Sequence, residues 1–206
     1  MIPFASRKVA PNYSLLWLNN PVMSEILQEL RGIIREKSLR LGDFTLSSGK
    51  KSSYYLDCRT TTLHPRGALL IAKLILEAIR KENIKADAIG GLTMGADPIA
   101  AAVAVVSEIE GRPLPAFIVR KESKDHGTQK FIEGYDGPKG AKVIIVDDVC
   151  TTAGSLLKAA EKAEEAGYQV TATFCVVDRE EGGTELIRKR YPFYALLTAK
   201  DLLKND

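Results

Sequence analysis

An apolar run that ends in two adjacent acids constrains the fold of this chain more than any other feature. Val143 to Val146 are consecutive β-branched residues, and Asp147 and Asp148 follow them directly. Such a run is typical of a strand that is buried on both faces of a parallel sheet. The two acids then fall at the carboxyl end of the strand, where open α/β sheets bind their ligands. Because neighbouring carboxylates repel and are costly to bury, we expect them to face hydrogen-bond donors or a cation.

The loop after the acids favours a phosphate group. Residues 149–155 read VCTTAGS and offer three hydroxyls and a row of backbone N–H groups before a predicted helix. Gly154 is expected to supply a positive φ in this loop. Acids beside a phosphate loop match a ribose 5-phosphate, whose hydroxyls would donate to the carboxylates. The alternative is an ordinary strand, turn and N-cap, because Asp, Thr, Gly and Ser are all common turn residues.

Helical and strand patterns alternate along the chain. Helices are expected over residues 23–37, 65–81, 96–110 and 155–166, with Ser24 as the N-cap of the first. Strands are expected over residues 88–92, 115–119, 142–146, 168–177 and 194–197. This alternation predicts the α/β class, with a doubly wound, mainly parallel sheet flanked by helices. Since no linker interrupts the pattern, we expect one domain over residues 23–206, preceded by a leader or arm at residues 1–22.

Composition excludes several kinds of partner. With 29 basic and 26 acidic residues the formal net charge is +3, too small to indicate nucleic acid or an anionic membrane as a partner. No apolar run approaches the ~20 residues of a transmembrane helix, and residues 1–22 lack a signal-peptide core. Cys58, Cys150 and Cys175 are widely spaced, which argues against a disulfide framework or a structural zinc site. A reduced, cytoplasmic protein is therefore expected.

Basic residues are concentrated in one segment. Arg120, Lys121, Lys124, His126 and Lys130 fall within residues 120–130. One interpretation is a solvated charged loop. The other is a mobile cationic loop that closes over a departing diphosphate, neutralises its charge and expels water.

Residues 44–59 suggest a second part of a site. Ser48 and Gly49 would allow the backbone to approach a flat ligand closely, and Tyr54 and Tyr55 would supply a stacking face. The alternative is a β-hairpin with its paired tyrosines in the core.

Arg179 lies at the end of a predicted strand. An arginine fork suits the two acceptors of a carboxylate or an imide edge. The alternative is a surface ion pair with Asp178 or Glu180.

These segments, taken together, resemble the orotate branch of the type I phosphoribosyltransferases. The strand followed by DDVCTTAGS resembles the signature for phosphoribosyl diphosphate (PRPP), and RKESKDHG resembles the catalytic loop of the orotate enzymes. The blocks at residues 44–59, 90–96 and 179 occur in the family's order. The resemblance implies an N-terminal hood at about 23–62 and a core at about 63–206. It also implies Mg²⁺-dependent transfer of ribose 5-phosphate from PRPP to N1 of orotate, giving orotidine 5′-monophosphate and diphosphate in pyrimidine synthesis.

The resemblance also assigns roles to individual residues. Lys124, His126, Asp147 and Asp148 would be catalytic, and Tyr55, Thr151 and Arg179 would bind orotate. PRPP would be bound by these four catalytic residues together with Arg120, Lys121, Val149, Cys150, Thr151, Thr152, Ala153, Gly154 and Ser155. Mg²⁺ would be carried mainly by PRPP oxygens and water, without direct protein ligands.

A homodimer with shared active sites is implied as well. Arg120, Lys124 and His126 would act in the neighbouring subunit's site, and Lys121 in its own.

The sequence departs from the family at two lysine positions. Ser47 stands where the family often has lysine, and Lys50 and Lys51 are the candidates to replace it. Met94 stands where some members have a second lysine, so backbone N–H groups of residues 90–96 would make the diphosphate contacts. Two alternatives stay open: a phosphoribosyltransferase for another nucleobase, and a non-catalytic PRPP-sensing regulator on the same fold.

Overall fold

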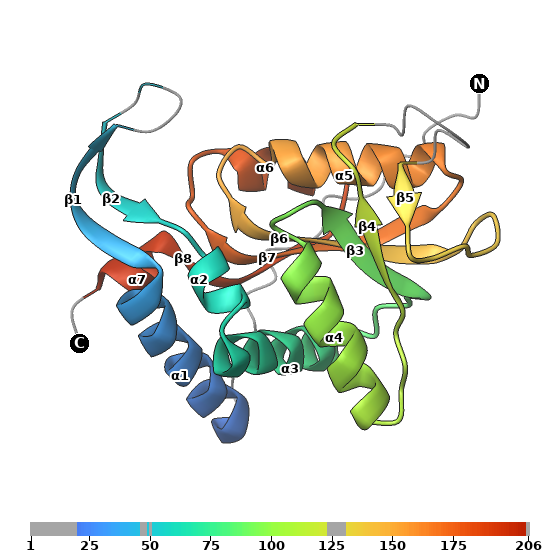
Figure 1. Ribbon diagram of the computed structural model, residues 1–206, viewed down its shortest axis with the longest axis horizontal. Helices are drawn as coiled ribbons and strands as arrows, with labels where there is room; N and C mark the ends of the chain where they lie inside the picture. Colours follow the sequence, from blue (N-terminus) through green and yellow to red (C-terminus); the bar gives the residue numbers. More distant parts are fainter. Residues whose placement is uncertain (1–19, 46–48, 50, 123–130, 205–206) are drawn as a thin grey trace.

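The computed structural model describes residues 20–45, 49, 51–122 and 131–204. Figure 1 shows a central sheet with helices on both faces and a hairpin that projects to one side. The helices are α1 (Pro21–Lys37), α2 (Arg59–Thr62), α3 (Pro65–Lys81), α4 (Asp97–Ile109), α5 (Gly154–Glu165), α6 (Gly183–Arg188) and α7 (Ala199–Leu203). The strands are β1 (Leu39–Thr45), β2 (Lys51–Leu56), β3 (Ala88–Leu92), β4 (Ala116–Val119), β5 (Ile132–Glu133), β6 (Lys142–Cys150), β7 (Gln169–Asp178) and β8 (Phe193–Thr198).

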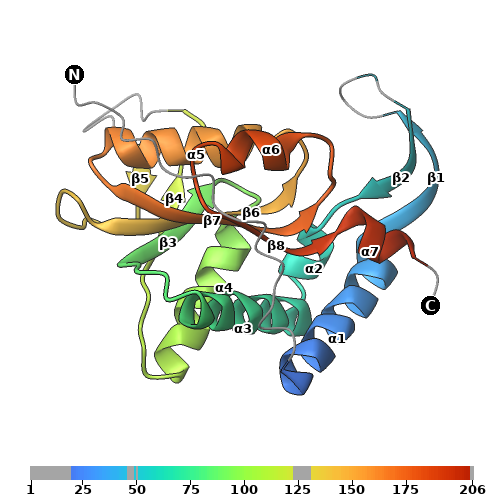
Figure 2. The same ribbon diagram turned by 180° about the vertical axis from the view of Figure 1, so that it is seen from behind.

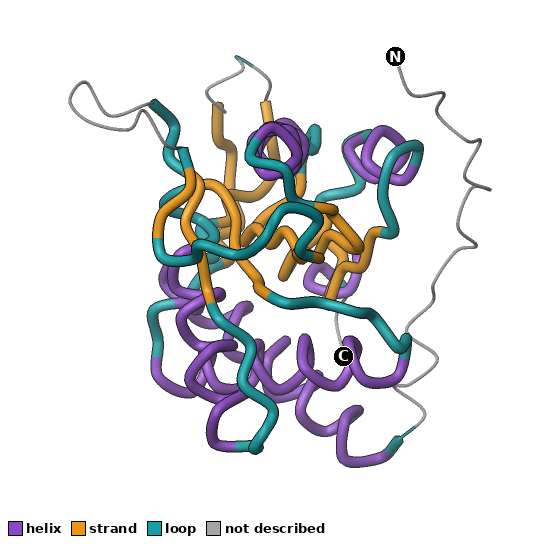
Figure 3. The backbone as a smooth tube through the Cα atoms, turned by 90° about the vertical axis from the view of Figure 1, so that its right-hand side faces the viewer, coloured by secondary structure: helices purple, strands orange, loops and turns teal. Residues whose placement is uncertain are grey.

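The main sheet is doubly wound, as the alternating pattern predicts. Its strand order is β5-β4-β3-β6-β7-β8, and every neighbouring pair is parallel except the edge strand β5, which runs antiparallel to β4. Helices α3 and α4 lie on one face and α5 and α6 on the other (Figures 1 and 2). Seen from the side in Figure 3, the sheet separates the two helical layers.

Strand β6 joins the two halves of the core. Ile144 and Val146 pack into the core on the α3 and α4 side, whereas Val143 and Ile145 pack into the core beneath α5. All four side chains are at most 1% exposed. This burial on both faces explains why the strand is apolar at every position rather than at every second one.

The chain reverses its direction of winding between β3 and β6. These strands are neighbours, but α4 follows β3 on one face of the sheet and α5 follows β6 on the other. The loops at the carboxyl ends of the two strands therefore diverge and leave a crevice, which is where ligands bind in open α/β sheets.

Strands β1 and β2 form an antiparallel hairpin with a sheet of its own. Helix α1 packs against the main core through Leu30 and Ile34. The division into a hood and a core near residue 62 stays a prediction. No helix in the described ranges has both the length and the apolar character that crossing a bilayer requires.

Helix α1 begins earlier than its apolar pattern predicts. Pro21 is its first residue, and Asn20 is the N-cap, with its Oδ1 accepting a hydrogen bond of 3.1 Å from the backbone N–H of Val22. The prediction of Ser24 as the N-cap is therefore wrong. Asparagine and serine are both good caps, but Pro21 at the first position fits the helical φ without losing a bond, so the helix starts before Ser24.

Candidate functional site

A pocket of about 350 Å³ opens at the crevice between β3 and β6. Segments far apart in the sequence supply its wall: the end of β2, the β3–α4 loop, the end of β4, the end of β6 and the end of β7. The lining residues are Tyr55, Leu56, Asp57, Arg59, Leu92, Thr93, Met94, Gly95, Lys121, Asp147, Asp148, Val149, Thr151, Ser155 and Arg179.

A second pocket of about 400 Å³ adjoins the first. Both are lined by Leu92, Asp147, Val149, Thr151 and Ser155. The second adds Cys150, Thr152, Ala153, Gly154, Leu156 and Lys158 from the loop and the first turns of α5. The two pockets thus form one continuous site with an acidic part and a part rich in hydroxyls and backbone amides.

Asp147 and Asp148 form a buried pair in the last part of β6. Asp147 is only 7% exposed, and its Oδ1 accepts a bond of 3.0 Å from the N–H of Asp148. The Oδ1 of Asp148 accepts one of 2.8 Å from the N–H of Val149. Burial, with the charge of Asp148 adding to it, raises the pKa of Asp147 to about 7. Burial raises the pKa of Asp148 as well. The backbone donors at this end of β6 do not offset the cost of burial, so the pair favours further donors or a cation.

The β3–α4 loop packs directly on this acidic pair. A Cβ atom at Gly95 would overlap Asp147 Oδ1 and would lie 2.8 Å from Asp148 Oδ1. The loop is held from its other side by a hydrogen bond of 2.6 Å from Thr93 Oγ1 to Asp97 Oδ2. Only glycine at position 95 allows this backbone to approach the carboxylates so closely.

The loop before α5 is shaped differently from its prediction. The residue with a left-handed backbone is Ala153, with φ of 61°, whereas Gly154 is the first residue of the helix. The prediction of a positive φ at Gly154 is therefore wrong. Gly183 packs behind the loop: its N–H donates to Thr151 O at 3.1 Å, and a Cβ there would lie 2.6 Å from the same oxygen. The packing of Gly183 against the loop supports the left-handed backbone of Ala153.

The first turn of α5 is open to a ligand. No side-chain hydrogen bond caps it at Ala153. The amides of this turn have no partner within the helix, so they and the positive end of the helix dipole favour an anion. Cys150 is 1% exposed, so any contact that it makes with a ligand is through its backbone.

Arg179 forms part of the pocket wall rather than a surface ion pair with Asp178 or Glu180. Its side chain is 7% exposed, and its guanidinium lies over the ring of Tyr54 at 4.6 Å from the centroid. Its Nε donates to Glu181 Oε1 at 2.8 Å. The other two guanidinium nitrogens have no partner among the residues that the structure describes.

The neighbours of Arg179 bond elsewhere. Asp178 accepts from Thr184 Oγ1 and from the N–H of Glu180, and Glu180 pairs with Lys200 at 2.8 Å.

The two tyrosines of β2 lie in different surroundings. Tyr54 packs against the main core and beneath Arg179, as the hairpin alternative predicts. Tyr55 is 40% exposed, lines the pocket and lies 5.7 Å from the ring of Phe44. The hairpin interpretation therefore holds for Tyr54, whereas a stacking role for Tyr55 stays a prediction.

The structure brings most of the predicted site residues together. Tyr55, Lys121, Asp147, Asp148, Val149, Thr151, Ser155 and Arg179 line the first pocket, and Cys150, Thr152, Ala153 and Gly154 line the second. Arg120 does not line either pocket: its Nη1 pairs with Glu133 at 3.3 Å. Lys124 and His126, together with Ser47, Ser48 and Lys50, lie outside the described residues.

The interpretation of the sequence missed Asp57 and Arg59, which also line the first pocket. Both lie within the block at residues 44–59, so an acid and an arginine two positions apart at a strand end were the available signal. Groups of three or more His, Cys, Asp or Glu side chains suited to a metal ion do not occur in the described part of the chain.

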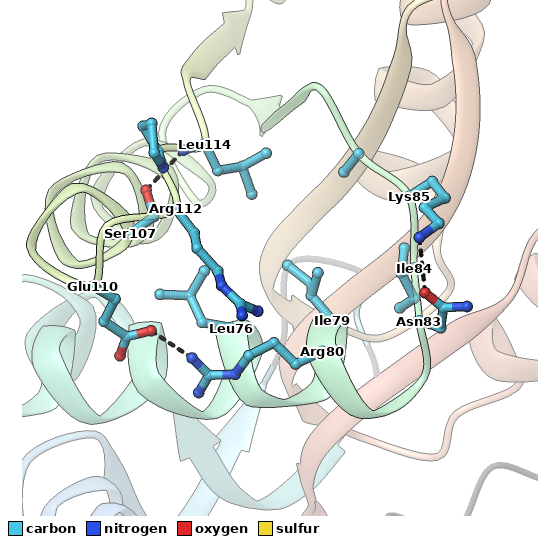
Figure 4. A pocket seen from close by; sticks show the side chains of 12 residues that line it. Leu76, Ile79, Arg80, Asn83, Ile84, Lys85, Ser107, Glu110, Arg112 and Leu114 are labelled. Atoms are coloured by element: carbon cyan, nitrogen blue, oxygen red, sulfur yellow. Dashed lines mark hydrogen bonds and ion pairs between the residues drawn. The ribbon is translucent and has the colours of Figure 1, made fainter.

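Among the residues that the structure describes, two further hollows lie away from the crevice and lack this chemistry. The one in Figure 4, of about 400 Å³, lies between the carboxyl ends of α3 and α4. Arg80 there already pairs at 2.7 Å with Glu77 and with Glu110, and Lys85 donates to Asn83 at 2.9 Å. Another, of about 650 Å³, lies beside Tyr135 and Tyr168. The hollow beside Tyr135 and Tyr168 is the larger of the two and has Glu133, Asp136 and Glu165 on its wall. Neither hollow combines two adjacent acids with the start of a helix, so we place the site at the crevice.

Known proteins are similar to this chain over most of its length. The family model of the phosphoribosyl transferase domain matches residues 60–200. An orotate phosphoribosyltransferase of a Nostoc species is 43% identical over 188 residues, covering 91% of this chain and 90% of the relative. The orotate phosphoribosyltransferase of Aquifex aeolicus is 46% identical over 180 residues, covering 85% and 97%.

Solved structures are similar over the same range. Orotate phosphoribosyltransferase of Mycobacterium tuberculosis in complex with PRPP is 35% identical with a TM-score of 0.71, covering 86% of this chain and 98% of that one. Its complex with Fe(III) dicitrate gives a TM-score of 0.77 at 38% identity, covering 87% and 99%. The likeness to adenine phosphoribosyltransferase of Leishmania donovani, at 20% identity, concerns the fold alone.

Proposed function

This chain belongs to the orotate phosphoribosyltransferase family, and we propose that it transfers ribose 5-phosphate from PRPP to N1 of orotate. The products are orotidine 5′-monophosphate and diphosphate, in pyrimidine synthesis. One observation carries the proposal: a single pocket joins a buried acidic pair, an uncapped helix start and a nearly buried arginine.

The donor occupies both parts of the site. The 5-phosphate binds the amides of the first turn of α5 and the hydroxyls of Thr151, Thr152 and Ser155. The ribose hydroxyls donate hydrogen bonds to Asp147 and Asp148. These bonds replace the hydrogen bonds from water that burial removes from the two carboxylates. The acids then place negative charge near C1, where positive charge develops as the bond to diphosphate breaks.

The acceptor binds at the hairpin side of the pocket. Arg179 presents its free guanidinium nitrogens to the carboxylate or imide edge of orotate, with Thr151 and the ring of Tyr55 completing this part of the wall. Since N1 of orotate can itself bear negative charge, the transfer needs no strong protein base. Orientation and stabilisation of charge are the main tasks of the enzyme.

Cations of residues 120–130 neutralise the departing diphosphate. Lys121 lines the pocket of its own chain, whereas Arg120 is held away from it by Glu133. This separation supports a homodimer in which Arg120, Lys124 and His126 act in the neighbouring site. Helix α4, which leads into β4 and this segment, carries the exposed apolar side chains Val105 (61%) and Ile109 (79%), and such side chains suit a contact with a second copy.

Magnesium enters with PRPP. The acidic pair suits a cation nearby, because burial leaves its charge uncompensated, but two adjacent carboxylates do not make an octahedral cage. We therefore propose that oxygens of PRPP and water hold the ion and that Asp147 and Asp148 face it. When bound, the ion neutralises charge on the diphosphate.

An assay with several bases tests the proposal. Purified protein is incubated with PRPP and MgCl₂ and with orotate, uracil or adenine, and diphosphate release is measured. Orotate is expected to react, and omission of MgCl₂ is expected to stop the reaction. Turnover of uracil or adenine without orotate would assign another acceptor. PRPP binding without turnover of any base would favour a regulator.

Arg179→Ala tests the acceptor site. Losing a charge-assisted fork should raise KM for orotate about 10- to 100-fold and leave KM for PRPP within about twofold. Arg190→Ala is the matched control, because Arg190 pairs with Glu161 at 2.7 Å and does not line either pocket. Normal orotate kinetics in Arg179→Ala, measured by steady-state assay, would contradict this assignment.

A further inference from the structure

The rim of the pocket contains an arginine, Arg59, to which the proposed transfer has assigned no role. Arg59 is the first residue of α2 and follows β2 after a short turn. It lines the same pocket as Thr93, Met94 and Gly95 of the β3–α4 loop and as Asp148. It therefore lies beside the loop on which the diphosphate is expected.

Asp57 fixes the orientation of this arginine. Nε of Arg59 donates to Asp57 Oδ1 and Nη2 donates to Asp57 Oδ2, each at 2.8 Å. The N–H of Arg59 donates to the same Oδ1 at 3.1 Å. Asp57 thus occupies one edge of the guanidinium, and within the described part of the chain Nη1 has no partner. The side chain is 48% exposed, so this free nitrogen is accessible to a ligand.

The charges around the pocket show why a further cation is needed. A diphosphate and a 5-phosphate must enter a site whose wall already holds Asp57, Asp147 and Asp148. The β3–α4 loop brings no positive side chain, because Met94 occupies its exposed position. Among the described residues, Lys121, Arg179 and Arg59 are the cations that line the first pocket, and Lys158 lines the second. Arg179 is held by Glu181 on the hairpin side of the pocket, with Tyr54 beneath it.

We propose that Arg59 binds the diphosphate of PRPP through Nη1, the guanidinium nitrogen that Asp57 leaves free, with Asp57 as its positioning residue. This inference rests on the proposed function. Arginine suits the task because its planar fork can meet a carboxylate on one edge and phosphate oxygens on the other. The residue thereby supplies the charge that Met94 does not.

Arg66 provides a matched comparison in the same chain. It forms a two-bond pair with Glu29, at 2.6 Å for each bond, and its side chain is 52% exposed. This pair has the same chemistry and similar exposure, but Arg66 does not line either part of the site. A purely structural role for Arg59 would make the two arginines behave alike when each is replaced by alanine.

The experiment compares Arg59→Ala, Arg59→Lys and Arg66→Ala with the unchanged protein. In Arg59→Ala we expect the Kd of inorganic diphosphate, by calorimetry, and KM for PRPP to rise about tenfold or more, since a charge-assisted contact is lost. KM for orotate and the Kd of ribose 5-phosphate should stay within about twofold. In Arg59→Lys both constants should lie between those of Arg59→Ala and of the unchanged protein, because lysine keeps the charge without the planar fork. Arg66→Ala should match the unchanged protein.

Two results would overturn the proposal. One is unchanged diphosphate binding in Arg59→Ala; the other is an equal loss of diphosphate, ribose 5-phosphate and orotate binding, which indicates a structural role. The unchanged protein in the same series separates this inference from the proposed function. If it turns over orotate and PRPP while Arg59→Ala equals Arg66→Ala, only the role of Arg59 is wrong.

Discussion

Replacing Asp147 and Asp148 together by asparagine is expected to lower kcat/KM for PRPP by about a thousandfold or more. The same substitution should raise the stability of the protein without ligands. Asparagine keeps an oxygen that accepts the bonds from the N–H groups of Asp148 and Val149, so the end of β6 retains its local hydrogen bonds. It removes the negative charges that hold the ribose hydroxyls and stabilise the developing charge at C1.

The pH dependence of the stability difference follows from the raised pKa. Asp147 has a pKa of about 7 in the folded protein, against an ordinary value of 3.8. Between these values the folded state binds more protons, so the contribution of this group to the free energy of unfolding falls as pH rises from about 4 to about 7. Above that range the ionised carboxylate destabilises the fold, because burial and the charge of Asp148 disfavour its charged form.

Thermal unfolding from pH 4 to pH 8 measures this difference. The double variant should melt at a higher temperature than the unchanged protein at pH 8, and the two should converge near pH 4. PRPP should raise Tm of the unchanged protein and not that of the variant. A variant that melts lower at pH 8 would show that the pair stabilises the fold, and a variant that retains turnover would show that the pair is not needed for the reaction.

Lys124→Ala is expected to lower kcat by about a hundredfold or more, with a much smaller change in KM for PRPP. A cation that meets the diphosphate as its bond to C1 breaks acts mainly in the transition state. Lys81→Ala is the control, because Lys81 is 55% exposed on α3 and does not line either pocket. Steady-state kinetics with an unchanged kcat for Lys124→Ala would remove this lysine from catalysis.

Mixing two inactive variants tests whether the sites are shared. If Lys124 acts in the neighbouring subunit, a heterodimer of Lys124→Ala and Asp147→Asn contains one site with both residues intact. Random exchange of subunits should then restore about a quarter of the wild-type activity. If Lys124 acts within its own subunit, each site lacks one residue and the mixture stays inactive.

The fold was predictable where local and tertiary signals agreed. The unbroken β-branched run of β6 and the alternation of apolar helices with strands indicated a doubly wound sheet, and the structure has one. The short elements β5, α2 and α6 were missed because two to six residues hold too little periodicity. Helix α7 did carry a local signal, a capping box between Thr198 and Asp201.

The site was predictable where its functional groups are contiguous in the sequence. Asp147, Asp148 and the loop at residues 149–155 are contiguous, so their pattern could be interpreted directly. Arg59 was missed because its proximity to Gly95 and Asp148 exists only after β2 and β3 are placed in space. The sequence predicted a left-handed backbone at Gly154, but the structure has it at Ala153. This too depends on tertiary structure, because Gly183 packs against the loop and supports a conformation that alanine disfavours by itself.

A crystal structure of the protein with PRPP bound would show whether the acidic pair and the start of α5 hold the donor. We expect the 5-phosphate on the amides of residues 151–155 and the ribose hydroxyls within hydrogen-bonding distance of Asp147 and Asp148. Binding of PRPP in the hollow beside Arg80 and Arg112, or a 5-phosphate away from the start of α5, would contradict this expectation.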